Sequence, residues 1–500
     1  MKQSLIAVVV AVMALAGCHK PAVKRTEDKP AASAKIQELE CSAPQFGWLP
    51  TTPEPDSGPA PNEPEDCFFY KAAWQHFLVA TQPRADGQPA FLSFPNITTI
   101  FGSKAASKEF VGLKANELGV AVRDVQRPNS LPTHPSKMVS LAEGVRQAGG
   151  LFGLVVDGAG NPIFYSIHVN QPYANFIKTN GLTTEEAVEK NPLLEFEPGV
   201  AEFKAAWAVV PHGAPVDSSY IHAEVQIPNL SQDAQGVLRI GHGTRPVTLK
   251  LIALHVAFVI KDHPEFIWST FDHVMPDGKS DLAPSAASND PASAVAADPK
   301  ISYTIFAKGA ARSSANSPCP ALGPATCDSD KSHPVFDVAN QSFASASGVQ
   351  QTSVFREFPS SKSDRWAEED QSVVDLNTSM RSLLASPSGQ RDVRANYRLV
   401  GATWLENPRD SNGRKGDFVL GRAFANPIGQ DTENRSRIVS GEDALSSTAM
   451  ESFTQRDSPG CFSCHDTKRV LSDEQNNPPI LKPTMLNVSH VISRYLSQPQ

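Results

Sequence analysis

The sequence predicts an α+β fold, in which a large β-rich body with scattered helices is followed by a small helical module at the C-terminal end. Several runs between residues 151 and 261 alternate apolar and polar residues, which is typical of strands. The 41 prolines indicate many turns and irregular loops. A short amphipathic segment near residue 440 favours a helix, so we place the body at residues 65–439 and the module at 440–500.

An apolar run near the N-terminus predicts export. Lys2 is followed by the uncharged, largely apolar residues 5–16, which are too few to span a bilayer permanently but suit a signal peptide. A Leu-Ala-Gly triplet then precedes Cys18, as in a bacterial lipobox. We therefore expect residues 1–17 to be a lipoprotein signal peptide and Cys18 to carry lipid. An ordinary cleaved signal with a chance cysteine is the alternative.

The next segment, residues 18–64, is expected to be an acylated tail and proline-rich spacer. The mature protein would then face the periplasm or the cell surface, anchored by lipid to a membrane of the bacterial envelope. The 45 Lys and Arg against 53 Asp and Glu give a formal charge of −8, and no basic run occurs. This balance argues against nucleic acid as a partner.

The body is predicted from its strand patterns. A hairpin with a Gly/Asn/Pro turn is expected at 151–169, and further strands at 201–211, 219–228 and 247–261. The last of these is nearly continuously apolar, which indicates a buried strand.

Helices are expected at two places in the body. In residues 183–191 a capping box of Thr183 and Glu186 predicts a helix start, and a second helix is expected within residues 366–386. The low-complexity residues 281–300 are expected to form an exposed excursion.

Four cysteines are disulfide candidates in an oxidising compartment. Cys41 and Cys67 flank an acidic, proline-rich stretch, and Cys319 and Cys327 share a proline-rich loop. These pairings rest on proximity alone, so the swapped connectivity and buried free thiols stay open.

The remaining cysteines form a C-x-x-C-H motif of Cys461, Cys464 and His465. Haem attachment needs two thiols, which add across two vinyl groups of one porphyrin, and a histidine that binds the iron. A zinc site would need a second close pair of ligands, and only the distant His490 follows. A redox dithiol would need a βαβ context, which is missing upstream. The motif therefore predicts one covalent haem c, with His465 as the proximal iron ligand, and makes 440–500 a haem c module.

The sixth iron position has three candidates. Met485 follows a proline-rich loop and ranks first, ahead of His490 and then Met450. A methionine would raise the reduction potential and suit electron transfer, a second histidine would lower it, and an open position would admit peroxide or small gases.

Two helices are expected within this module. Ser440 is the expected N-cap of the first, and Leu445, Ala449 and Phe453 would form its apolar face. A short closing helix is expected at residues 490–496.

Histidines in the body raise the question of a second site. His255, His263 and His273 would share one face of an unbroken strand, although Pro264 is expected to break it, and His222 and His242 lie on nearby strands. A metal site is one hypothesis. The other is structural histidines paired with carbonyl groups or nearby aspartates such as Asp262 and Asp272.

Several passages are similar to a family of exported bacterial single-haem cytochrome c proteins. They lie at residues 72–80, 202–210, 254–274 and 396–408, and residues 445–465 resemble the segment that carries the haem in that family. The resemblance implies haem c and a redox function, and names no substrate. The chain departs from the family in the insertion near 281–300 and in the Cys319/Cys327 loop.

These features favour a membrane-tethered periplasmic c-type cytochrome that exchanges single electrons with a redox partner protein or a small molecule. A haem-dependent oxidoreductase is the alternative, with peroxide or another small substrate bound by the large body, which a carrier does not need. A haem-based sensor is the third hypothesis. The sequence identifies no catalytic residues.

Overall fold

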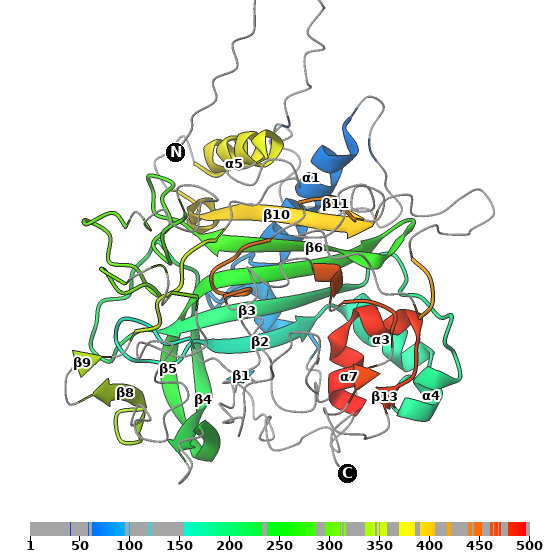
Figure 1. The fold of residues 1–500 in the computed structure, drawn as a ribbon, viewed down its shortest axis with the longest axis horizontal. Coiled ribbons are helices and arrows are strands. Elements are labelled where there is room, and N and C mark those ends of the chain that lie inside the picture. Colours follow the sequence, from blue (N-terminus) through cyan, green and yellow to red (C-terminus); the bar gives the residue numbers. More distant parts are fainter. Residues whose placement is uncertain are drawn as a thin grey trace, which may run out of the picture. The chain divides into compact units, whose positions relative to one another are not determined.

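A large antiparallel sheet forms the centre of the fold, and in the described part of the chain it has eight strands. Its order is β1 (Val120–Ala121), β2 (Phe164–Val169), β3 (Ala201–Val209), β5 (Leu238–Ile260), β6 (His263–His273), β10 (Tyr397–Leu405) and β11 (Val439–Gly441). The remaining strand, β4 (His222–Gln232), pairs with the first half of β5. Figure 1 shows the hairpin of β4 and β5 extending past the other strands.

The structure is a computed structural model, and it describes the residues listed here: 41, 59, 63–95, 100, 120–121, 155–232, 238–286, 295, 297–310, 312, 315–316, 336–345, 348–349, 351–357, 370–385, 391–405, 418–421, 439–442, 445–452, 461–463, 465–468, 470–471 and 479–496. All of them belong to one compact unit, Glu40–Gln500. Cys18, Cys319, Cys327 and Cys464 lie outside the described residues.

The strands β3, β4 and β5 occupy the three runs that alternation or continuous apolarity predicted. The hairpin predicted upstream is also present, because Val156 pairs with Pro162 across a turn in which Gly160 has a φ of 81°. Together with the helices these strands make a mixed fold with a large antiparallel sheet, which agrees with the α+β prediction.

A single strand through His255, His263 and His273 is not formed. β5 ends at Ile260, and a tight turn with Asp262 at a φ of 67° leads into β6 at His263. Pro264 therefore lies inside β6, and the chain reverses before it. The reversal puts His255 on one strand and the other two histidines on its neighbour.

One face of the sheet is covered by α1 (Glu65–Ala80), with α5 (Gln371–Leu384) packed beside it. Ring contacts join helix and sheet: Phe77 stacks on Phe271 with 4.3 Å between ring centroids, and Trp74 meets the same ring at 4.9 Å. This apolar layer also buries the disulfide between Cys41 and Cys67, the pairing expected from proximity. Figure 1 shows α1 behind the sheet and α5 next to β10.

The other face is covered by α3 (Gln171–Thr179) and by the C-terminal segment, by which we mean the described parts of residues 445–496. That segment contains the 3₁₀ turns η7 (Cys461–Ser463) and η8 (Met485–Val488), the short strands β12 (Val470–Leu471) and β13 (Pro479–Leu481), and the helix α7 (His490–Leu496). In Figure 1, α3 and α7 lie close together at one end of the sheet. Helix α7 is the closing helix that the sequence predicted.

The prediction of a helix that starts at Ser440 is wrong for the residues that the structure describes there. Ser440 pairs with Trp404 in β11, Gly441 has a φ of 76°, and residues 445–447 are not helical. A left-handed residue cannot lie in the first turn of an α-helix, so the chain leaves the sheet edge as an irregular segment. The predicted boundary between body and module falls inside β11, so both share one sheet.

The remaining elements are short. They are η2 (Ala90–Ser93), α4 (Glu185–Glu189), η6 (Val393–Asn396), and the small sheet of β7 (Phe336–Asp337), β8 (Ser342–Ser345) and β9 (Gly348–Val349). Thr184 caps α4 by accepting a hydrogen bond from the Ala187 amide, so the predicted cap at Thr183 was one residue early.

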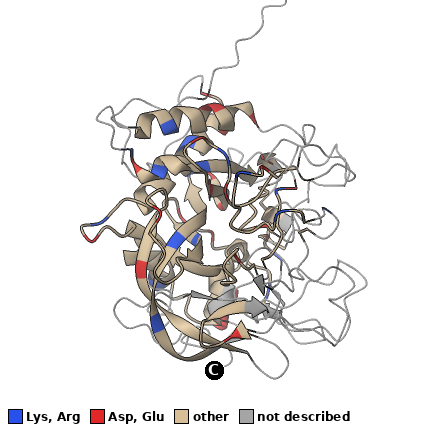
Figure 2. Cartoon of the chain, turned by 90° about the vertical axis from the view of Figure 1, so that its left-hand side faces the viewer, with Lys and Arg blue, Asp and Glu red and all other residues tan. Residues whose placement is uncertain are grey.

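Charged residues of both signs are interspersed over the described ribbon in Figure 2. None of the described helices is both long enough and apolar enough to cross a membrane.

Candidate functional site

The C-terminal segment covers two rows of polar and aromatic side chains on the sheet. Lys204 of β3 lies opposite His255 of β5, which lies opposite Thr270 of β6. Two residues further along each strand, Ala257 of β5 lies between Glu202 of β3 and Trp268 of β6. Opposite residues of an antiparallel pair point to the same face, so these side chains form a common surface under the segment.

His465 of the C-x-x-C-H motif lies on this surface. Its ring packs against Trp268 with 3.8 Å between centroids and an interplanar angle of 34°. His490 stacks on the His465 ring, with 4.1 Å between centroids and an interplanar angle of 19°. The motif itself is a tight turn, since the His465 amide donates to the Cys461 carbonyl over 3.0 Å. Half-buried Cys461 is thereby held close to the histidine backbone.

A backbone carbonyl fixes the orientation of the His465 ring. Nδ1 lies 2.8 Å from the carbonyl oxygen of Val488, and because a carbonyl only accepts, Nδ1 carries the proton and donates it. The lone pair of this tautomer is therefore on Nε2, and no described residue hydrogen-bonds to that atom. Burial, and next the neighbouring His490, hold the pKa of His465 well below its usual value, so the ring is neutral at pH 7.

These features fit a histidine that would hold haem iron. A ligating histidine almost always donates its other ring N–H to a carbonyl or carboxylate, which sets the tautomer and the ring orientation. His465 has this second partner and leaves Nε2 available. Cys461 and Cys464 would hold the porphyrin through thioethers, although Cys464 lies outside the described residues.

Met485, the first candidate for the sixth position, begins the 3₁₀ turn whose Val488 carbonyl accepts from His465 Nδ1. Its amide donates to the Pro192 carbonyl over 2.9 Å, and its side chain is buried.

The second candidate, His490, presents the face of its ring to His465. Met450, the third, is buried at 2 % exposure in the apolar core of this face, next to Ala449, whose carbonyl accepts from the Tyr165 hydroxyl.

Two carboxylates in this region were missed by the sequence analysis. Glu451 pairs with His255 Nε2 over 2.6 Å, and Glu202 accepts from the Ser489 hydroxyl over 2.5 Å. Burial raises the pKa of Glu202 to about 7. The sequence did contain a signal for these residues. Residues 202 and 204 are charged within an otherwise apolar strand, and because they are two positions apart they lie on one face of it.

His263 and His273 have separate structural partners. His263 bonds to Glu265 over 2.9 Å, and His273 bonds to Asp281 over 2.9 Å and to the Ser219 carbonyl over 3.1 Å. The expected partners Asp262 and Asp272 are not used, and Asp272 accepts from Ser447 instead. Within the described residues, no group of three or more His, Cys, Asp or Glu is arranged to hold a metal ion.

Comparison of the chain with models of protein families, with curated proteins and with solved structures gave no match.

Proposed function

We propose that the protein is a membrane-tethered periplasmic c-type cytochrome that carries one covalent haem and transfers single electrons. One observation carries the proposal: His465 ends a complete C-x-x-C-H motif and donates Nδ1–H to the Val488 carbonyl, which leaves the Nε2 lone pair for iron. The haem supplies the one-electron chemistry.

The chain's own residues would attach and orient the haem. The thiols of Cys461 and Cys464 would hold the haem through thioethers, and His465 would bind the iron. Trp268 and His490 both pack against the imidazole ring and limit its rotation. Electrons would pass to or from a redox partner protein or a small molecule, and lipid on Cys18 would keep the protein at the envelope.

A haem-dependent oxidoreductase, or a haem-based sensor, is the second candidate. It is favoured by the size of the body, residues 65–439, which a simple electron carrier does not need. If none of Met485, His490 and Met450 binds the iron, the iron would be open to peroxide or small gases.

The covalent haem is tested on denaturing gels. Wild-type protein should keep its haem through electrophoresis and give a haem-dependent stain, whereas the double variant Cys461→Ala, Cys464→Ala should lose it. His465→Ala should keep the thioethers and shift the absorption spectrum. Haem that extracts from the wild type into acidified organic solvent would refute the proposal.

Carbon monoxide separates the carrier from the alternatives. A carrier closed by Met485, the first candidate, should be low-spin and bind carbon monoxide slowly, and Met485→Ala should open it. A wild type that binds the gas at once favours the enzyme or sensor. If His490→Ala or Met450→Ala opens the iron instead, the carrier stands with a different sixth ligand.

A further inference from the structure

Ser489 joins the 3₁₀ turn η8 to the helix α7, next to the carbonyl that orients His465. Its amide and the Val488 carbonyl belong to one planar peptide group. The carbonyl accepts from His465 Nδ1 over 2.8 Å, and the amide donates to the Leu486 carbonyl over 3.2 Å. A contact that holds Ser489 in place therefore also fixes the direction of the carbonyl that orients the imidazole.

The side chain of Ser489 lies between two side chains from distant parts of the chain. Its hydroxyl donates to a carboxylate oxygen of Glu202 on β3, and it is 2.8 Å from the hydroxyl of Tyr173 on α3. Because the only hydroxyl proton of Ser489 goes to Glu202, Tyr173 is the donor in the second contact. The Ser489 oxygen also accepts from the Val491 amide over 3.4 Å, at the start of α7. We call Tyr173, Ser489 and Glu202 the hydroxyl clamp.

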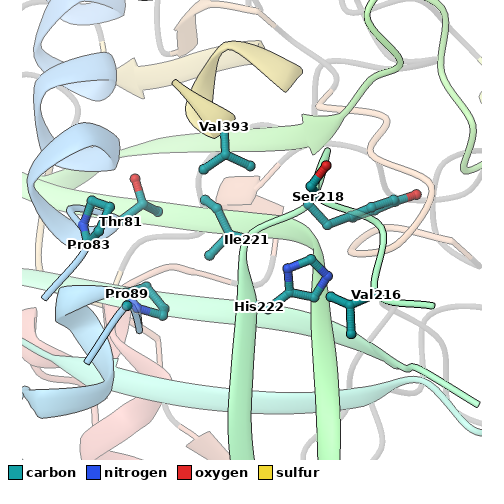
Figure 3. A pocket seen from close by; sticks show the side chains of 10 residues that line it. Thr81, Pro83, Pro89, Val216, Ser218, Ile221, His222 and Val393 are labelled. Carbon is teal, nitrogen blue, oxygen red and sulfur yellow. The ribbon is translucent and has the colours of Figure 1, made fainter. Parts of the chain in front are cut away.

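The hydroxyl clamp belongs to the protein interior. Ser489 and Tyr173 are both fully buried. The pocket of about 290 Å³ in Figure 3 opens elsewhere, at the start of β4, and its lining residues, which include Thr81, Ile221 and Val393, come from outside the C-terminal segment. The clamp is thus placed to hold chain segments together, by joining α3 and β3 to the junction of η8 and α7.

Alanine at position 489 would take a hydrogen-bond partner from two groups at once. The Tyr173 hydroxyl would lose its acceptor, and the Glu202 carboxylate would lose a donor. Polar groups inside a protein that lose a partner are costly, so the junction would move to relieve them. The Val488 carbonyl would move with it, because the peptide group is planar.

We propose that Ser489 is a positioning residue for the haem iron: held by Tyr173 and Glu202, it directs the Val488 carbonyl at Nδ1 of His465. This inference rests on the proposed function. A group that accepts from the second ring nitrogen of a ligating histidine fixes its tautomer and raises its basicity. A more basic ligand favours the oxidised iron, so the hydroxyl clamp should lower the reduction potential.

The tautomer of His465 tests the clamp without haem. In the full mature chain carrying Cys461→Ala and Cys464→Ala, nitrogen NMR of labelled histidines should show His465 protonated on Nδ1. Adding Ser489→Ala should raise the fraction protonated on Nε2 relative to Nδ1 by about 3- to 10-fold, the usual value of one hydrogen bond. Tyr173→Phe should change it in the same direction, and this variant replaces Ser489→Ala if that one does not fold.

Ser166→Ala is the matched control. Ser166 is also a buried serine whose hydroxyl lies between two side chains, 2.9 Å from Trp207 Nε1 and 2.8 Å from His168 Nε2. It lies in the core on the α1 side of the sheet, where Trp207 is buried. This variant loses the same kind of buried contact, so it should lower stability and leave the His465 tautomer and the reduction potential unchanged.

The haem-carrying protein gives the second measurement. Ser489→Ala and Tyr173→Phe should both shift the electron-exchange equilibrium with a soluble mediator toward reduced protein, by about 3- to 10-fold. Ser489→Thr, which keeps the hydroxyl, should behave as the wild type does. Tyr173→Phe is the cleaner of the two losses, because its hydroxyl contacts Ser489 and removing it changes no charge.

Two results would overturn the role of Ser489: an unchanged His465 tautomer in both Ser489→Ala and Tyr173→Phe, or an equal change in Ser166→Ala. An unchanged reduction potential in both clamp variants would exclude an effect at the iron. Absence of covalent haem from the wild type is a different failure, because it refutes the proposed function while the tautomer of His465 still reports on the clamp.

Discussion

Two buried histidines make the stability of this protein sensitive to acid. His76 on α1 stacks on Phe258 with 4.3 Å between centroids, and His168 on β2 meets the edge of Phe91 at 4.9 Å. Burial lowers the pKa of each from 6.5 to about 3. Between these values the unfolded chain binds more protons than the folded one, so the free energy of unfolding falls as pH drops below about 6.5.

Replacing one of these histidines by phenylalanine, which does not titrate, should remove that histidine's contribution to the loss of stability at low pH. At pH 5 each buried histidine lowers the free energy of unfolding by about 2 kcal/mol, because one pKa unit is worth about 1.36 kcal/mol. His76→Phe keeps the stacked ring, so urea unfolding should show it gaining about 2 kcal/mol on the wild type between pH 7 and pH 5. His212→Ala, at an exposed position, should follow the wild type. Parallel curves for His76→Phe and wild type would contradict the prediction.

At the scale of elements, the close packing beside β10 and β11 depends on a glycine, Gly401 in β10. Glu442, which directly follows β11, is fully buried, and its carboxylate occupies the space where a Cβ of Gly401 would be. The Tyr70 hydroxyl lies 3.1 Å from a carboxylate oxygen of Glu442 and 3.3 Å from a carboxylate oxygen of Asp370. Burial, and next the Glu442 charge, raise the pKa of Tyr70 well above its usual value, so it remains a donor.

Gly401→Ala should therefore destabilise the protein by about 1–3 kcal/mol, the usual effect of overpacking a core. In a Glu442→Ala background the same change should have a smaller effect, because the group it displaces is gone. Gly158→Ala is the control: its new Cβ would lie 3.5 Å from Gln351, an ordinary contact, so it should change stability by less than about 0.5 kcal/mol. Equal losses at Gly401 in both backgrounds would argue against this account.

Sequence patterns predicted the strands better than the C-terminal segment. β3 and β4 followed from alternation, and β5 from its nearly continuous apolar run, because each has at least one face packed on a core. Leu445 and Ala449 were expected to be buried on a helix, and they are buried, but in an irregular segment. Four-residue spacing identifies a buried side, whereas pairing of Ser440 with Trp404 depends on a distant strand and overrides the helix signal.

For the candidate site, the motif identified His465 but not its neighbours. Trp268, Val488 and Glu451 come from separate parts of the chain, and only the register of β5 and β6 brings Trp268 under the motif.

For the whole molecule, the location prediction depends on Cys18. Wild-type protein should partition with membranes and show added lipid mass on an N-terminal Cys18, since more than one acyl chain gives stable anchoring. Cys18→Ala should be released or keep its signal peptide. Cys319→Ala, which leaves the signal intact, should partition as the wild type does. Soluble wild type with no mass added at Cys18 would exclude the tether.

The arrangement of the C-terminal segment also sets an order of events in maturation. The strands that carry Glu202, His255 and Trp268 are synthesised before the segment that covers them. The strands of the sheet can therefore pair while the described parts of residues 445–496 are still undocked. If haem is attached as proposed, the two thiols of the motif would have to be reached during that interval. Fast docking would then hinder haem attachment, whereas slow docking would leave buried side chains of this sheet face, such as Trp268, exposed to aggregation. The rate at which this segment settles on the sheet would thus decide the yield of finished protein.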